Sequence, residues 1–103
     1  MQNKSQWPKT IKDAAERVIA KMSEEDKQTF RRTQSDELAR FQFGMGVFIR
    51  TKFGLNAGNA ALLKACALTQ QQCDAYNIFY QDDPDSASGV IIEAVWKQLK
   101  RAA

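Results

Sequence analysis

Residues 84–99 read PDSASGVIIEAVWKQL, and they indicate the fold class more clearly than any other stretch. Apolar side chains recur here every three or four positions, which is the period of an amphipathic α-helix. Asp83 is a suitable N-cap, and Pro84 is favoured as the first residue of a helix. The sequence therefore predicts a helix from Pro84 to about residue 100, with an inward face of Ala87, Val90, Ile91, Ala94, Val95 and Leu99.

The N-terminal half repeats this period after three further helix-start signals. Thr10 and Ser23 are good N-caps, and acidic residues follow both, as the helix dipole favours. Ser35 begins a longer apolar stripe that ends at Phe53, just before a glycine that can end a helix. We therefore expect helices over 11–22, 24–32 and 35–53.

Two shorter helices are expected in the next part of the chain. Asn59 can cap a helix over 60–68, and Thr69 with Gln72 can open another over 70–80. Patterns typical of β-strands are weak throughout. The predicted fold is all-α: a compact single-domain bundle of about five to six helices that spans residues 1–103, with residues 1–6 frayed.

Length and composition restrict the classes of function. The chain has 103 residues, with 15 Lys and Arg against 12 Asp and Glu, and a formal net charge of +3. This excess is small for a dedicated nucleic-acid-binding protein. Histidine is absent from the sequence, which removes the commonest general base and metal ligand. We therefore expect a protein that is not an enzyme, with no catalytic residues, metal or cofactor.

The two cysteines and the lack of export signals indicate a cytoplasmic protein. If Cys66 and Cys73 share one helix, their Cα atoms lie roughly 10 Å apart, which is too far for a disulfide. The sequence contains neither a signal-peptide pattern nor an apolar run of about 20 residues. We expect two inert thiols in a reducing compartment and no contact with a membrane.

Residues 41–50, FQFGMGVFIR, are the least regular part of the expected third helix. Gly44 and Gly46 would each cost about 1 kcal/mol relative to alanine inside a helix. One explanation is that a partner or ligand approaches the backbone here. The other is that another helix of the same domain crosses closely. Phe43 lies off the apolar stripe, which would make it an exposed anchor.

Charged residues flank this segment and cluster again before the last helix. Arg40 and Arg50 lie at its two ends. Arg50 could pair with the cluster Asp82, Asp83 and Asp85, or it could grip a carboxylate or phosphate of a partner. The acidic cluster does not match the spacing of an EF-hand loop. A helix cap is the simplest explanation for it, and an acidic patch that faces a partner is the alternative.

Together these segments resemble a small bacterial family of helical proteins of about this length and of unknown function. The resemblance rests on Gly44-x-Gly46-x-x-Ile49-Arg50 and on Pro84-Asp85-x-Ala87-Ser88. The family pattern has histidine at the positions of Gln42 and Asp83, and an aromatic residue near Asn56. The resemblance implies one compact domain and supplies no reaction; the residues that it carries over are Gly44, Gly46, Arg50, Asn59, Pro84, Asp85 and Ser88.

The favoured hypothesis is a small protein-binding module, such as an immunity-type inhibitor that neutralises a bacterial toxin or effector domain. It is favoured by a short chain without catalytic groups that carries charges of both signs. Because the chain is mildly basic, an acidic face on the partner would suit it. The expected partner-binding residues are Arg40, Phe43, Gly44, Gly46, Arg50, Asn59, Asp82, Asp83 and Asp85.

Two alternatives belong to other classes of function. The first is a nucleic-acid-binding accessory protein, whose affinity would fall steeply with salt. It would use Lys21, Lys27, Arg31, Arg32 and Arg40. The second is a small-molecule binder or enzyme, which needs an apolar pocket with converging polar groups. It would use Arg50, Asn59 and Asp85.

Overall fold

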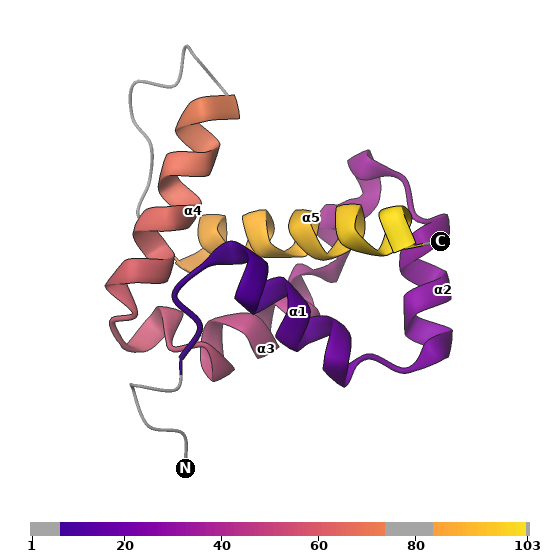
Figure 1. Cartoon of the computed structure of the whole chain (residues 1–103), viewed down its shortest axis with the longest axis horizontal. Helices are drawn as coiled ribbons and strands as arrows, with labels where there is room; N and C mark the ends of the chain where they lie inside the picture. The colour runs from indigo at the N-terminus through magenta and orange to yellow at the C-terminus, as the bar shows by residue number, and fades with distance from the viewer. Residues whose placement is uncertain (1–6, 74–83, 103) are drawn as a thin grey trace.

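The computed structural model describes residues 7–73 and 84–102, and these parts of the chain are helical, without strands (Figure 1). The all-α fold class is thereby confirmed. Five α-helices and two 3₁₀ helices follow one another in the described ranges. They are α1 Ile11–Lys21, α2 Glu24–Arg32, η2 Ser35–Phe43 (3₁₀), α3 Met45–Lys52, η3 Leu55–Ala57 (3₁₀), α4 Ala60–Cys73 and α5 Pro84–Ala102.

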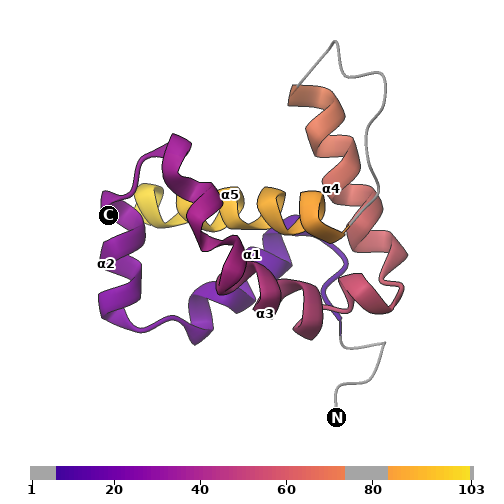
Figure 2. The same cartoon turned by 180° about the vertical axis from the view of Figure 1, so that it is seen from behind.

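Helix α5 runs through the middle of the molecule, and the other elements pack around it. It contacts α1, α2, α3, α4 and both 3₁₀ helices. Figure 2 shows η2 crossing it on the side opposite to α1. Pro84 lies in α5, as predicted, whereas Asp83 lies outside the described residues. The buried residues of α5 are Ala87, Ser88, Ile91, Ile92, Val95 and Leu99.

This buried set differs from the inward face expected for α5. Ile92 and Ser88 are buried although they were not expected to be, while Val90 and Ala94 are only half-buried. The reason is that α5 has neighbours on more than one side, so its buried surface is wider than one amphipathic stripe. The core therefore includes a hydroxyl group as well as aliphatic side chains.

The first two helices begin as their capping residues predict. The Oγ1 of Thr10 accepts a hydrogen bond from the Asp13 amide at 3.1 Å, and the Oγ of Ser23 accepts one from the Asp26 amide at 3.1 Å. Both contacts satisfy N–H groups that a helix start would otherwise leave unpaired. At the other end of α2, Trp96 Nε1 donates to the carbonyl of Thr33 at 2.8 Å, which ties α2 to α5.

The expectation of one α-helix over 35–53 is wrong. Residues 35–43 form a 3₁₀ helix, and α3 begins only at Met45, after Gly44. In a 3₁₀ helix, residues three apart lie on the same side. Leu38 is buried, and the ring of Phe41 lies 4.5 Å from that of Phe30. The tighter winding therefore turns both apolar side chains toward the core, and Gly44 weakens the continuous helix at the break.

The boundary expected at Thr69 is also wrong, because α4 continues from Ala60 to Cys73. The hydroxyl of Thr69 donates to the carbonyl of Ala65 at 3.1 Å, one turn earlier in the same helix. It therefore satisfies its polar group within the helix and does not cap a new one. The rest of the helix expected over 70–80 lies outside the described residues from position 74 onward.

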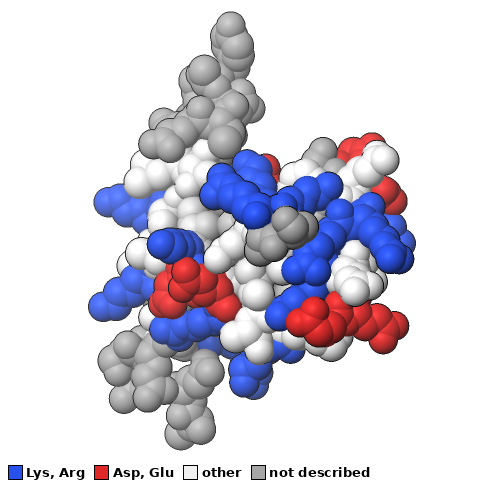
Figure 3. All heavy atoms as spheres, turned by 45° about the vertical axis from the view of Figure 1, so that its right-hand side comes forward, with Lys and Arg blue, Asp and Glu red and all other residues white. Residues whose placement is uncertain are grey.

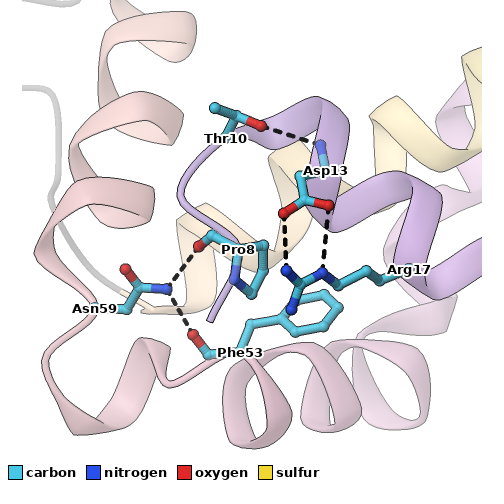
Figure 4. A network of polar contacts seen from close by, with 6 residues as sticks. All are labelled: Pro8, Thr10, Asp13, Arg17, Phe53 and Asn59. Carbon is cyan, nitrogen blue, oxygen red and sulfur yellow. Dashed lines mark hydrogen bonds and ion pairs between the residues drawn. The ribbon is translucent and has the colours of Figure 1, made fainter. Parts of the chain in front are cut away.

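Asn59 joins three parts of the chain and is 5% exposed (Figure 4). Its Nδ2 donates to the carbonyl of Pro8 at 2.9 Å and to that of Phe53 at 2.7 Å. Its Oδ1 accepts from the Leu62 amide at 3.4 Å, so the predicted cap of α4 is confirmed. One amide group thus fixes the segment before α1, the end of α3 and the start of α4.

Within the described ranges, the helices are too short or too polar to cross a lipid bilayer.

Replacing Asn59 with Asp tests its role as a donor. The carboxylate keeps a capping oxygen but cannot donate to the two buried carbonyls, so we expect a loss of at least about 2 kcal/mol in the free energy of unfolding. Burial among carbonyl groups raises the pKa of the introduced carboxyl in the folded protein, so the loss should diminish as the pH falls toward about 4 and the protonated group can donate again. Urea denaturation at several pH values measures this. Thr10→Asp, at an exposed cap, is the control and should be nearly neutral. An equal loss of stability for both changes would show that Asn59 acts only as a helix cap.

Candidate functional site

An apolar groove with a volume of about 380 Å³ opens between the end of α1, helix α2 and the junction of η2 with α3. We call it the main groove. Its floor and walls are largely aromatic and methionine side chains, and Gly44 lies at its edge. The lining residues are Val18, Lys21, Met22, Asp26, Thr29, Phe30, Phe41, Gly44, Met45 and Phe48.

Aromatic packing holds the walls of the main groove in place. The rings of Phe30 and Phe41 are tilted by 36° against each other, and Phe48 packs edge-on against Phe53 at 6.0 Å. Phe30 and Phe53 are buried, so Phe41 and Phe48, which pack against them, are anchored to the core. Met45 adds a flexible, polarisable side chain, which can adapt to the shape of an apolar ligand.

Two exposed apolar side chains lie next to the groove-lining residues in the chain. Phe43 is 90% exposed and Val47 is 48% exposed. Phe43 precedes Gly44, and Val47 precedes Phe48. Among the residues that the structure describes, the other large exposed apolar side chain is Leu68, on α4. The predicted exposure of Phe43 is thus confirmed, and Val47 is a neighbour that the sequence did not single out.

A second groove of about 340 Å³ continues the main groove along α1 and α3. It shares Lys21 and Phe48 with the main groove, and Lys52 and Arg17 also line it. Arg17 forms a two-point ion pair with Asp13, shown in Figure 4. Within the described ranges, neither Lys21 nor Lys52 forms an ion pair. Lys52 in the second groove and Lys21, which both grooves share, therefore give this part of the combined groove a positive charge.

A polar network behind the glycine segment connects α3 to α5. Arg50 donates through one guanidinium nitrogen to Gln42 Oε1 at 2.9 Å and to Ser88 Oγ at 3.0 Å. The Ser88 hydroxyl, which is 0% exposed, donates to Gln42 Oε1 at 2.8 Å. Sequence reasoning missed this network, because Gln42 and Ser88 are distant in the chain and neither residue type identifies such a partner.

The two glycines of the segment serve different purposes. Gly46 is buried, and a Cβ there would collide with Gln42 Oε1 and approach the Arg50 guanidinium to 2.9 Å. It leaves room for the network, so the close neighbours are side chains of its own segment and not a crossing helix. Gly44 is exposed, and a Cβ there would meet nothing within 4 Å.

The predicted partner-binding residues divide into three groups. Phe43, Gly44 and Arg40 are exposed, and Gly44 lines the main groove. Arg40 pairs with Glu37 and lies over the ring of Phe41, another lining residue. Gly46 and Asn59 are buried, and Arg50 is half-buried in the network, so the first two contribute nothing to an exposed surface. The others lie outside the described part of the chain: residues 82 and 83 entirely, and Asp85 in its side chain.

The residues of the second alternative, a small-molecule or enzyme site, do not converge. Asn59 bonds to Pro8 and Phe53, whereas Arg50 bonds to Gln42 and Ser88. Neither of them lines the grooves described above. They belong to two separate structural networks.

Cys66 is a buried free thiol in α4. Burial disfavours the thiolate and raises the pKa of Cys66 to about 12. The thiol is therefore neutral over the physiological pH range and unsuited to nucleophilic attack.

The glycine pair gives a matched test of packing. Gly46→Ala should lower the free energy of unfolding by about 1–3 kcal/mol, because the methyl group displaces the half-buried side chains of Gln42 and Arg50 from their hydrogen bonds. Gly44→Ala should leave it unchanged or raise it by up to about 1 kcal/mol, since the added Cβ projects into open space. Thermal and urea denaturation measure both. Gln42→Ala added to Gly46→Ala should recover part of the loss; additive effects would contradict the collision.

The thiol is tested in a Cys73→Ser background. Native protein should resist iodoacetamide at pH 8, because the neutral and buried Cys66 thiol is a poor nucleophile, and the same protein in concentrated urea should react fully. Mass spectrometry reads the extent of reaction. Rapid modification of the native protein would show that Cys66 is accessible and reactive.

Comparison with known proteins assigns this chain to a family. A search of curated proteins found no match, and a search of solved structures found none. Residues 7–99 match a family described as a domain of unknown function, DUF6794. The match covers both structural networks and the main groove. The chain therefore belongs to the DUF6794 family.

Proposed function

We propose that this domain is a protein-binding module that receives a segment of its partner in the main groove. The observation that carries the proposal is Phe43, an aromatic side chain that is 90% exposed and directly precedes Gly44, a residue that lines the apolar groove. Burying such a side chain contributes about 1.5–3 kcal/mol. Aromatic anchors of this kind are enriched at the energetic centres of protein interfaces.

The lining of the main groove favours protein binding over catalysis. Its polar side chains are one amine, one carboxylate and one hydroxyl, from Lys21, Asp26 and Thr29, and the rest is apolar. A surface of this composition suits the apolar face of another protein. An immunity-type inhibitor of a toxin or effector domain is the specific form of the proposal. A domain of this size can supply the area of about 800 Å² that a standard interface needs from each partner.

Nucleic-acid binding is the second candidate, and one observation favours it. Lys and Arg side chains gather over the C-terminal ends of α2 and α5, which lie in contact (Figure 3). The last turns there hold Arg31, Arg32, Lys100 and Arg101. Two other cations expected to bind nucleic acid are paired, however: Lys27 with Glu24 and Arg40 with Glu37. Carboxylates so close to the cations weaken the attraction for phosphates. This candidate therefore ranks below protein binding.

The test compares three exposed apolar residues. Tagged wild-type protein, Phe43→Ser, Val47→Ser and Leu68→Ser are used to recover partners from the native host, with and without nuclease. We expect one stoichiometric protein that survives nuclease and whose recovery falls about tenfold or more with Phe43→Ser. Val47→Ser should give a smaller loss, and Leu68→Ser should match the wild type.

Thermal denaturation of the same variants controls for folding. Because all three side chains are exposed, each variant should melt within about 2 °C of the wild type. Equal recovery with Phe43→Ser and the wild type would refute docking at this groove. Recovery that disappears with nuclease would instead support the nucleic-acid candidate.

A further inference from the structure

We infer that the segment received by the main groove is an amphipathic α-helix with acidic residues at one end. The inference rests on the proposed function and adds the chemistry and orientation of the partner. It follows from the shape of the combined groove and from the charges at its two ends.

The two grooves form one track because they share lining residues. The main groove and its continuation have Lys21 and Phe48 in common, and their volumes are about 380 and 340 Å³. Each space is large enough for one or two large apolar side chains. Their walls are helical surfaces, and the described residues offer no sheet edge for an added strand. A helix that inserts side chains one turn apart is therefore the mode of recognition that fits.

The charges along the track are unequal. Lys21 lines both grooves and so lies where they meet, and one end carries Lys52 together with the Arg17–Asp13 ion pair. The other end carries Asp26, which belongs to the first turn of α2 together with Glu24 and Glu25. A partner helix with acidic residues over the lysines gains attraction there, and carboxylates at its other end would face like charge. The partner is thus acidic at one end and neutral or basic at the other.

The probes are three synthetic helical peptides of about four turns. All carry leucines at positions i, i+3, i+4 and i+7, and their first turn contains glutamates, glutamines or lysines. Fluorescence anisotropy measures their affinity for the full chain at low and high salt. We expect the glutamate peptide to bind about tenfold more tightly than the lysine peptide at low salt, and this difference should shrink as salt screens the charges.

Variants of the protein locate the effect. Lys21→Glu and Lys52→Glu should each lower the affinity of the glutamate peptide about three- to fivefold and raise that of the lysine peptide. Lys64→Glu, an exposed change of the same charge on α4, should alter neither. A nitroxide label on the glutamate end should broaden the NMR signals of Lys52 and Arg17 more than those of Asp26 and Thr29.

Each other outcome overturns this inference. Equal binding of the three peptides would show that the groove does not discriminate between peptides by their charge. If none of them binds while host-partner recovery still depends on Phe43, the proposed function stands and the acidic helix is the wrong occupant. A dimer in sedimentation that Phe43→Ser dissociates would make a second copy of the chain the occupant. If Phe43→Ser leaves the recovery of the host partner intact, it is the proposed function that fails.

Discussion

Burial of α5 on more than one side is the constraint on which the rest of the structure depends. Ile91, Ile92 and Val95 are almost completely buried, so this helix needs neighbours on two faces at once. Helix α1 covers one side and η2 the other, and α2, α3 and α4 also contact it (Figures 1 and 2). Each removed contact would expose aliphatic surface, at roughly 25 cal/mol for every Å².

Two polar networks fix the positions of chain segments that apolar packing alone does not orient. Asn59 holds the segment before α1 against α3 and α4, and the buried hydroxyl of Ser88 holds Arg50 and Gln42 against α5. These directional contacts set the position of residues 41–50. Gln42 is held in this network, whereas the next residue, Phe43, is exposed. The surface that we propose for a partner thus follows from the way the same segment is anchored to the core.

Local signals predicted the fold class and most helix starts, whereas long-range contacts decided the rest. Thr10, Ser23, Asn59 and Pro84 act within a few residues, so the sequence was sufficient to identify them. The break at Gly44 and the continuity of α4 depend on the packing of Phe41 on Phe30 and on the hydroxyl of Thr69. In the candidate site, Phe43 was expected to be exposed because it leaves the apolar stripe. Lys21 and Lys52 share a groove only through the tertiary arrangement, so no local pattern identifies them.

The most direct measurement of the central claim is site-specific photo-cross-linking in the native host. A benzophenone side chain in place of Phe43 should cross-link to one protein, through an apolar helix of that protein with acidic residues at one end. The same group in place of Leu68, an exposed apolar residue on α4, should give no such product. Cross-links of equal yield at both positions, cross-links to nucleic acid, or none at Phe43 would contradict the account.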